Sequence, residues 1–275
     1  MSLIKRVLGS LEARLNAPRL SLWRTVYTNF RVLPFIQAIK FPIYIYGKLG
    51  LWGLQGKVIL LDTPIRRGMI QIGVNVDSFT RFDYSGFIQL ACNRARLIFH
   101  GPCRISQNSK IRVTDGELHF GRYAVIGSGS KVICNGKHIW FGDYSRTAFE
   151  VCIINSGFHS VYSEVKGGFK NKTSDIYIGN KVWLANRATI TGGAYIPDST
   201  IVCSGSLVNK NYSSANQETQ MLAGCPAKVV ATGVRRVFSP RYENEISEWF
   251  VKHPNETFYS VANFEDHCEE IKVEF

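Results

Sequence analysis

The feature that most constrains this sequence is a hydrophobic repeat of six residues between positions 176 and 208. Every sixth position holds a branched aliphatic side chain: Ile178, Leu184, Ile190, Ile196, Val202 and Val208. The position two residues earlier is small or β-branched each time: Ile176, Val182, Ala188, Ala194, Thr200 and Ser206. A period of six fits neither an amphipathic helix nor one long strand. It predicts a solenoid of short strands, three to a turn, whose coils stack about 4.8 Å apart around a narrow apolar interior.

Glycine and asparagine recur where such a solenoid must bend, because both tolerate positive φ angles. They are Gly179, Asn180, Asn186, Gly192, Gly193 and Gly205. An imperfect form of the repeat reaches back to about Ile70, with glycines that end three successive segments: Gly101, Gly121 and Gly142. Gly179 follows Gly142 only after 37 residues, so we expect a loop inserted around Gly157 to Ser174. Loops that leave a rigid scaffold often carry function.

The chain divides into three predicted parts. Residues 1–60 form a basic, apolar extension that is partly helical, and residues 61–236 form the β-helix, with the inserted loop at 157–174. Residues 237–275 form an acidic helical tail.

Helix signals occur near both termini. Apolar residues recur at i, i+4 spacing near the start of the chain, as an amphipathic helix requires: Leu3, Val7, Leu11 and Leu15. In the tail, Ser239 followed by Pro240 predicts a helix N-terminus. Pro254 predicts that this helix ends near His253.

The net charge of +12 is unevenly distributed. Residues 1–50 carry +7, which suggests an anionic partner such as a membrane surface or a phosphorylated substrate, whereas residues 238–275 carry −6. No nucleic-acid motif accompanies the basic residues, so nucleic acid is not expected. The apolar run Arg31–Lys48 is too short and too interrupted to span a membrane. Residues 1–55 therefore either cap the open end of the solenoid or lie on an anionic membrane.

The seven cysteines are dispersed and odd in number, without a C-x-x-C pair. This pattern indicates reduced thiols in a reducing compartment. Glu12, Arg14 and Arg19 interrupt the first apolar run, so no secretory signal is expected. We therefore expect a cytoplasmic protein, with contact at the inner face of the membrane left open.

Three segments resemble the C-terminal half of the hexapeptide-repeat acyltransferases. They are I-G-N-K-V-W-L-A-N-R-A-T-I from Ile178, C-S-G-S-L-V-N-K-N from Cys203 and A-G-C-P-A-K-V from Ala223. The pattern is similar to maltose and galactoside O-acetyltransferases and to enzymes that acetylate capsular and lipopolysaccharide sugars. The close match covers residues 155–232. It implies an all-β solenoid of the left-handed parallel β-helix class, a homotrimer, and acetyl-CoA bound as co-substrate between subunits.

The resemblance implies that His159, in N-S-G-F-H-S, is the catalytic base, since it precedes Trp183 by 24 residues as the family's loop histidine does. A sugar hydroxyl is a poor nucleophile until a base removes its proton. Imidazole titrates near neutral pH and suits this role. The hydroxyl then attacks the thioester, and a backbone N–H at a coil corner stabilises the oxyanion. The group that orients the ring stays open between Glu150, Glu164 and a backbone carbonyl.

The resemblance also implies cofactor and acceptor contacts. Corner positions whose backbone would contact the pantetheine arm are Ala185 and Ser204. Positions that would line the adenosine-phosphate end, where a cation meets phosphate, are Asn209, Lys210 and Lys228. Trp183 either lines the acceptor pocket or packs within the solenoid. Many relatives carry an asparagine on a coil before the histidine, where this sequence has G-S-G-S, so Ser128 or Ser130 would take its place at the acceptor.

The predicted function is acetyl-CoA-dependent O-acetylation of a sugar hydroxyl in a cell-envelope polysaccharide or its precursor. N-acetylation of an amino-sugar nucleotide and a non-catalytic assembly module are the alternatives. A zinc-dependent carbonic anhydrase on this scaffold would need three converging histidines. His100, His119 and His138 lie one, two and four residues before their respective glycines, so their side chains are not expected to meet, and no metal is expected.

Overall fold

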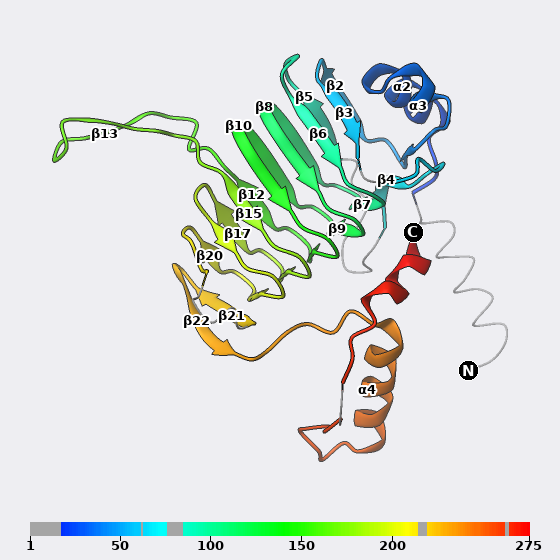
Figure 1. Ribbon diagram of the computed structural model, residues 1–275, viewed down its shortest axis with the longest axis vertical. Coiled ribbons are helices and arrows are strands. Elements are labelled where there is room, and N and C mark those ends of the chain that lie inside the picture. The colour runs from blue at the N-terminus through cyan, green and yellow to red at the C-terminus, as the bar shows by residue number, and fades with distance from the viewer. Residues whose placement is uncertain (1–17, 62, 76–84, 214–218, 262–263) are drawn as a thin grey trace.

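The computed structural model describes residues 18–61, 63–75, 85–213, 219–261 and 264–275. They form a rod of stacked parallel strands, with helices toward both ends of the chain (Figure 1). The predicted parallel β-helix is therefore confirmed. Within these residues, no helix is both long enough and apolar enough to cross a membrane. The helical pattern expected from Leu3 to Leu15 lies outside the described residues.

Each coil contributes to three faces. Face 1 is a nine-stranded sheet of β1 (Ile43–Ile45), β4 (Ile70–Val74), β7 (Cys103–Ser106), β9 (Ala124–Ile126), β11 (Arg146–Thr147), β16 (Trp183–Leu184), β19 (Ile201–Val202), β21 (Gln220–Gly224) and β22 (Ala227–Thr232). Face 2 comprises β2 (Gly50–Leu54), β5 (Phe87–Leu90), the first parts of β8 (Lys110–Phe120) and β10 (Lys131–Phe141), β12 (Cys152–Ile154), β17 (Thr189–Thr191) and β20 (Leu207–Val208). Face 3 comprises β3 (Lys57–Leu60), β6 (Arg96–Phe99), the second parts of β8 and β10, β15 (Ile176–Ile178) and β18 (Tyr195–Ile196).

The six-residue repeat fills the interior as predicted. All six aliphatic residues of the series are fully buried: Ile178, Leu184, Ile190, Ile196, Val202 and Val208. Their smaller companions, two residues earlier, are also buried. Ile178 pairs with Ile196 in the next coil, 18 residues further along the chain, so each coil here consists of three six-residue units. The repeat therefore sets both the core and the strand register.

Earlier coils are longer because β8 and β10 continue from face 2 onto face 3. Phe120 of β8 pairs with Phe141 of β10, 21 residues later. Phe99, Phe120 and Phe141 form a column inside the rod, with ring centroids 5.6 and 6.0 Å apart. All three side chains are buried. Register shifts around Asn135 in β10 absorb the extra corner residues.

Glycines mark the edge between face 3 and face 1, because the coils approach closely there. A Cβ added at Gly142 would lie 2.4 Å from the carbonyl oxygen of Gly179. The residue types at the bends differ in part from the prediction, because several residues with positive φ angles are neither glycine nor asparagine. Lys181 and Arg187 have φ angles of 54° and 60°. The strand pairing on both sides of each bend fixes this backbone conformation despite its intrinsic cost.

The N-terminal extension contributes more strand than expected, because β1, β2 and β3 lie within residues 1–60. Before them, α2 (Leu22–Val32) and α3 (Phe35–Ala38) cover the open end of the rod (Figure 1). Thr25 Oγ1 accepts a hydrogen bond from the Ile45 N–H at 3.0 Å. Asn29 accepts one from the Ile43 N–H at 3.2 Å and donates to the Ile43 carbonyl at 2.7 Å. Polar side chains of α2 thus satisfy the edge strand β1, which would otherwise present unpaired backbone groups.

The helix expected in the tail is confirmed as α4 (Pro240–Lys252), with Ser239 as N-cap and His253 as C-cap. The Ser239 hydroxyl accepts a hydrogen bond from the Tyr242 N–H at 3.3 Å. None of the α4 residues is buried. A 3₁₀ helix, η1 (Cys268–Glu274), follows, and the tail is held to the rod by Phe275, whose ring contacts Tyr123 at a centroid distance of 5.3 Å.

Candidate functional site

The inserted loop leaves the rod through a closed neck at the corner between faces 2 and 3. Asn155 is buried there and donates a hydrogen bond to the Gly136 carbonyl at 2.7 Å. The Gly157 N–H donates to the Lys172 carbonyl at 2.9 Å, and Ser156 forms an antiparallel bridge with Thr173. The outgoing and returning chains are thus tied together at the base of the loop. Asn155 and Ser156 were not singled out from the sequence, although N-S-G is a turn signal.

Beyond the neck, β13 (Val161–Ser163) and β14 (Gly168–Lys170) form an antiparallel hairpin that projects from the rod (Figure 1). His159 lies between the neck and the hairpin, and it is exposed. It borders a pocket of about 390 Å³ that also touches the next coil at Thr191 and Gly192. The pocket therefore has a fixed floor, made by the rod, and a wall made by the loop.

The orienting partner of His159 is not supplied by Glu150, because that carboxylate is bonded to Arg187 Nε at 2.7 Å. Glu164 is exposed on the hairpin. Within the described part of the chain, the His159 ring makes no hydrogen bond, while its backbone N–H donates to the Gly157 carbonyl at 2.7 Å. The described residues thus supply no hydrogen bond that orients the ring, and His159 borders the pocket.

The residues expected at the cofactor lie along two edges of the rod. On the edge between faces 2 and 3, which carries His159, lie Asn209 and Lys210, both exposed just after β20. On the edge between faces 1 and 2 lie Ala185 and Ser204, where the Ser204 hydroxyl donates to Asn186 Oδ1 at 2.7 Å. Lys228 is exposed on β22 opposite Ala223. One chain does not bring these two groups together, because face 2 separates them.

The residues expected to bind the acceptor do not come together at the His159 pocket. Ser128 and Ser130 are both fully buried, so their hydroxyls are not available to a substrate on the surface of the chain. Ser130 Oγ instead accepts a hydrogen bond from the Val151 N–H at 3.2 Å and holds two coils together. Trp183 lies on face 1 with the Arg236 guanidinium 5.3 Å from its ring centroid. Trp183 therefore has a packing partner, and it is not among the residues that line the His159 pocket.

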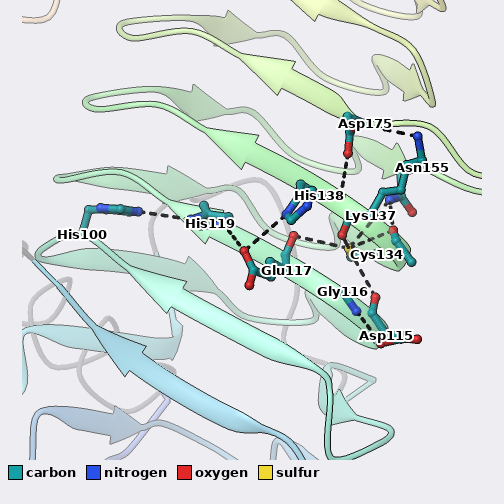
Figure 2. A network of polar contacts seen from close by, with 11 residues as sticks. His100, Asp115, Gly116, Glu117, His119, Cys134, Lys137, His138, Asn155 and Asp175 are labelled. Carbon is teal, nitrogen blue, oxygen red and sulfur yellow. Dashed lines mark hydrogen bonds and ion pairs between the residues drawn. The ribbon is translucent and has the colours of Figure 1, made fainter.

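The three spaced histidines do come together, contrary to the expectation from their offsets. His100 Nε2 lies 3.2 Å from His119 Nδ1, and the His119 and His138 rings both contact Glu117 (Figure 2). The offsets from the glycines do not predict this cluster, because Glu117 and His119 share one side of β8 and His138 pairs with Glu117 in the neighbouring coil. Burial lowers the pKa of His119, although its hydrogen bond to Glu117 acts in the opposite direction.

No family model matches the chain. The chain is 23% identical over 199 residues to WbbJ of Escherichia coli strain K12, which is named as an O-acetyl transferase of lipopolysaccharide biosynthesis; this covers 62% of the chain and 95% of WbbJ. Among solved structures, the polysialic acid-specific acetyltransferase NeuO is 19% identical with a TM-score of 0.43, over 80% of this chain and 91% of NeuO. AntD, an N-acyltransferase from Bacillus cereus, is 13% identical with a TM-score of 0.41, over 77% of this chain and 88% of AntD.

The fold described above rests on the chain's own strand pairing rather than on these structures. WbbJ matches in sequence along nearly its whole length. Together with the six-residue repeat and the motifs from Ile178 onward, this similarity indicates that the chain is an acyltransferase that resembles the hexapeptide-repeat type.

Proposed function

We propose that this enzyme transfers an acetyl group from acetyl-CoA to a sugar hydroxyl of a cell-envelope polysaccharide or its precursor. The observation that carries the proposal is the position of His159, exposed beside a pocket of about 390 Å³ with a rigid floor. The name of WbbJ, an O-acetyl transferase of lipopolysaccharide biosynthesis, supports this class of acceptor. Lys170 and Lys172 border the same pocket, so the acceptor meets a cationic rim.

His159 acts as general base in this proposal. Acetyl-CoA supplies the thioester, which is the activated acyl donor. The imidazole removes the proton of the sugar hydroxyl as the oxygen attacks, and later returns it to the departing sulfur. A backbone N–H at a coil corner stabilises the negative charge that develops on the carbonyl oxygen. The exposed Lys210 and Lys228 suit the phosphates of the cofactor, because ammonium groups form charge-assisted hydrogen bonds with them.

A homotrimer supplies the remaining geometry in this proposal. His159 and Lys210 lie on one edge of the rod, whereas Ser204 and Lys228 lie on the far side of face 2. A second copy, packed against face 2 or its edges, would bring the second group beside the first. Closed rotational symmetry then gives each interface the same site.

The experiment that tests the proposal is release of free CoA thiol from acetyl-CoA, measured with a panel of acceptors, alongside the mass of the protein in solution. Neutral sugars and envelope oligosaccharides are expected to accelerate release. Acceleration by amino-sugar nucleotides alone would favour N-acetylation instead. Failure of every acceptor would favour a non-catalytic assembly module. A monomer that retains full activity would contradict the shared site.

We further propose that the N-terminal helices contact an anionic membrane. Helix α2 exposes apolar side chains and buries polar ones. Its buried residues include Thr25 and Asn29, whereas Trp23 is 85% exposed. In α3, Phe35 and Ile36 are 69% and 73% exposed. Residues 18–61 contain no acidic side chain, so the basic residues beside this apolar surface are not neutralised locally. Exposed aromatic and aliphatic side chains flanked by cations are typical of segments that lie in the headgroup region.

Replacing Trp23, Phe35 and Ile36 together by serine is expected to abolish flotation with vesicles that contain phosphatidylserine. The apolar contact is lost while the hydrogen bonds of Thr25 and Asn29 to β1 remain. Val251→Ser is the matched control, because Val251 is 81% exposed at the other end of the chain. Equal flotation of the two variants would remove the membrane contact from the proposal. Deleting residues 1–55 is a poorer test, since it also removes β1 and β2.

A further inference from the structure

Three metal-ligating side chains project from one side of face 3. Glu117 and His119 are two residues apart on β8, so they point to the same side of the strand. His138 on β10 lies directly opposite Glu117 in the parallel pairing. Figure 2 shows the three side chains converging from these two adjacent coils.

The separations between these groups suit a small cation. His119 Nε2 lies 3.1 Å from Glu117 Oε2, and His138 Nδ1 lies 3.3 Å from the same oxygen. The three ligand atoms all lie within 4.8 Å of one another. In a tetrahedral zinc site, bonds of about 2.1 Å place neighbouring ligand atoms about 3.4 Å apart. Small side-chain rotations would therefore be enough to admit the ion.

The surroundings hold His119 in the orientation that such a site needs. Its Nδ1 lies 3.2 Å from His100 Nε2, which leaves Nε2 directed at Glu117. Its ring also packs on Trp140, with centroids 4.6 Å apart. A hydrogen bond to the second ring nitrogen is the usual support of a metal-binding histidine. His100 therefore acts as a positioning residue rather than as a ligand.

The site is open on one side, and Arg96 does not compete for its carboxylate. The His138 side chain is 57% exposed and that of Glu117 is 39% exposed, which gives an ion a path of entry and a position for water. Arg96 lies beside Glu117 in the coil on the other side. Its guanidinium donates to the carbonyl oxygens of Asn93 and Ala95, so it does not neutralise the carboxylate by direct contact.

We infer that Glu117, His119 and His138 form a binding site for a divalent zinc-class cation that joins two adjacent coils. Two imidazole nitrogens and one carboxylate oxygen are a donor set that zinc accepts, with a fourth position left for water or a ligand. The site is separate from the His159 pocket and does not depend on the proposed function. An ion that binds only the folded chain stabilises it in proportion to the logarithm of its concentration.

The test uses the full-length chain with Cys225→Ser, which removes the exposed thiol, after treatment with a chelator. Titration calorimetry with zinc chloride is expected to show saturable binding near one ion per chain, together with a rise in melting temperature. Glu117→Gln and His138→Ala are each expected to weaken binding at least about tenfold. His253→Ala is the control, because this exposed histidine lies at the end of α4.

Two results would overturn the inference. One is the absence of saturable zinc binding. The other is equal affinity in Glu117→Gln, His138→Ala and the control. His138 and Glu117 are partly exposed, so both variants are expected to melt as the parent does in the absence of metal, which the same melting curves establish. Visible absorption of a bound Co²⁺ ion, lost in the same variants, reports the ligand set independently of affinity.

Discussion

Replacing His159 by alanine is expected to lower the turnover number about 10²–10⁴-fold, the usual contribution of a positioned general base. The residue is exposed and touches a pocket rather than the core, so its loss leaves the fold intact. The measurement is thiol release under saturating acetyl-CoA with the best acceptor of the panel. The solution mass and CoA affinity are expected to match those of the wild type.

Lys166→Ala is the matched control, because Lys166 is exposed on the same inserted loop but does not line the pocket. It is expected to retain turnover within about twofold, as surface substitutions away from special features have small effects. His159→Asn keeps a polar side chain without a basic nitrogen and is expected to behave as the alanine variant does. Turnover in His159→Ala that matches the control would exclude this residue as the base.

Replacing Phe120 by alanine is expected to cost about 3–5 kcal/mol of unfolding free energy. Its ring is fully buried between those of Phe99 and Phe141, so its removal leaves a cavity inside the rod. Urea unfolding followed by circular dichroism measures the loss. Association of chains, as proposed above, would add to the apparent stability, so the variants are compared at equal protein concentration.

The control for this change is Phe169→Ala on the hairpin. Phe169 is 73% exposed and has one aromatic contact, to Tyr162 at a centroid distance of 5.2 Å. Its loss is expected to cost less than about 1 kcal/mol. A Phe120 variant that unfolds at the same urea concentration as the Phe169 variant would show that the column does not hold the coils together.

The rod could be predicted from the sequence because its core residues recur at a regular interval of six positions. Every member of the series from Ile178 to Val208 is buried, and the pairing of Ile178 with Ile196 follows from the spacing alone. The longer coils were harder to derive. Their register depends on the irregular pairing around Asn135, and such a shift leaves no periodic signal.

The orientation of α2 could not be derived from hydrophobicity. Its apolar side chains suggested a hydrophobic cap, yet Thr25 and Asn29 face the rod. The backbone groups of β1 that lack a neighbouring strand determine which side of α2 faces the rod. Leaving these groups buried without hydrogen bonds would cost more free energy than exposing a few apolar side chains. Which strand lies at the edge of a sheet depends on the order of all the strands, so it cannot be predicted from one stretch of sequence.

The candidate site was predictable only in part. The loop and His159 followed from a break in the repeat and from a motif, whereas the burial of Ser128 and Ser130 did not. Both serines are adjacent to a tight corner, where Gly127 approaches the carbonyl of Ala148 so closely that an added Cβ would lie 2.2 Å from its oxygen. The contact of His119 and His138 with Glu117 was missed because it depends on pairing between coils.

The closed neck at Asn155 has a consequence for how such enzymes diversify. Thr147 and Leu184 are register partners in neighbouring coils, although 37 residues separate them instead of the 18 residues of a plain coil. The stacking on either side is unaffected by what the chain does in between. Insertions, deletions and exchanges can therefore accumulate in the loop without altering the coils that carry it.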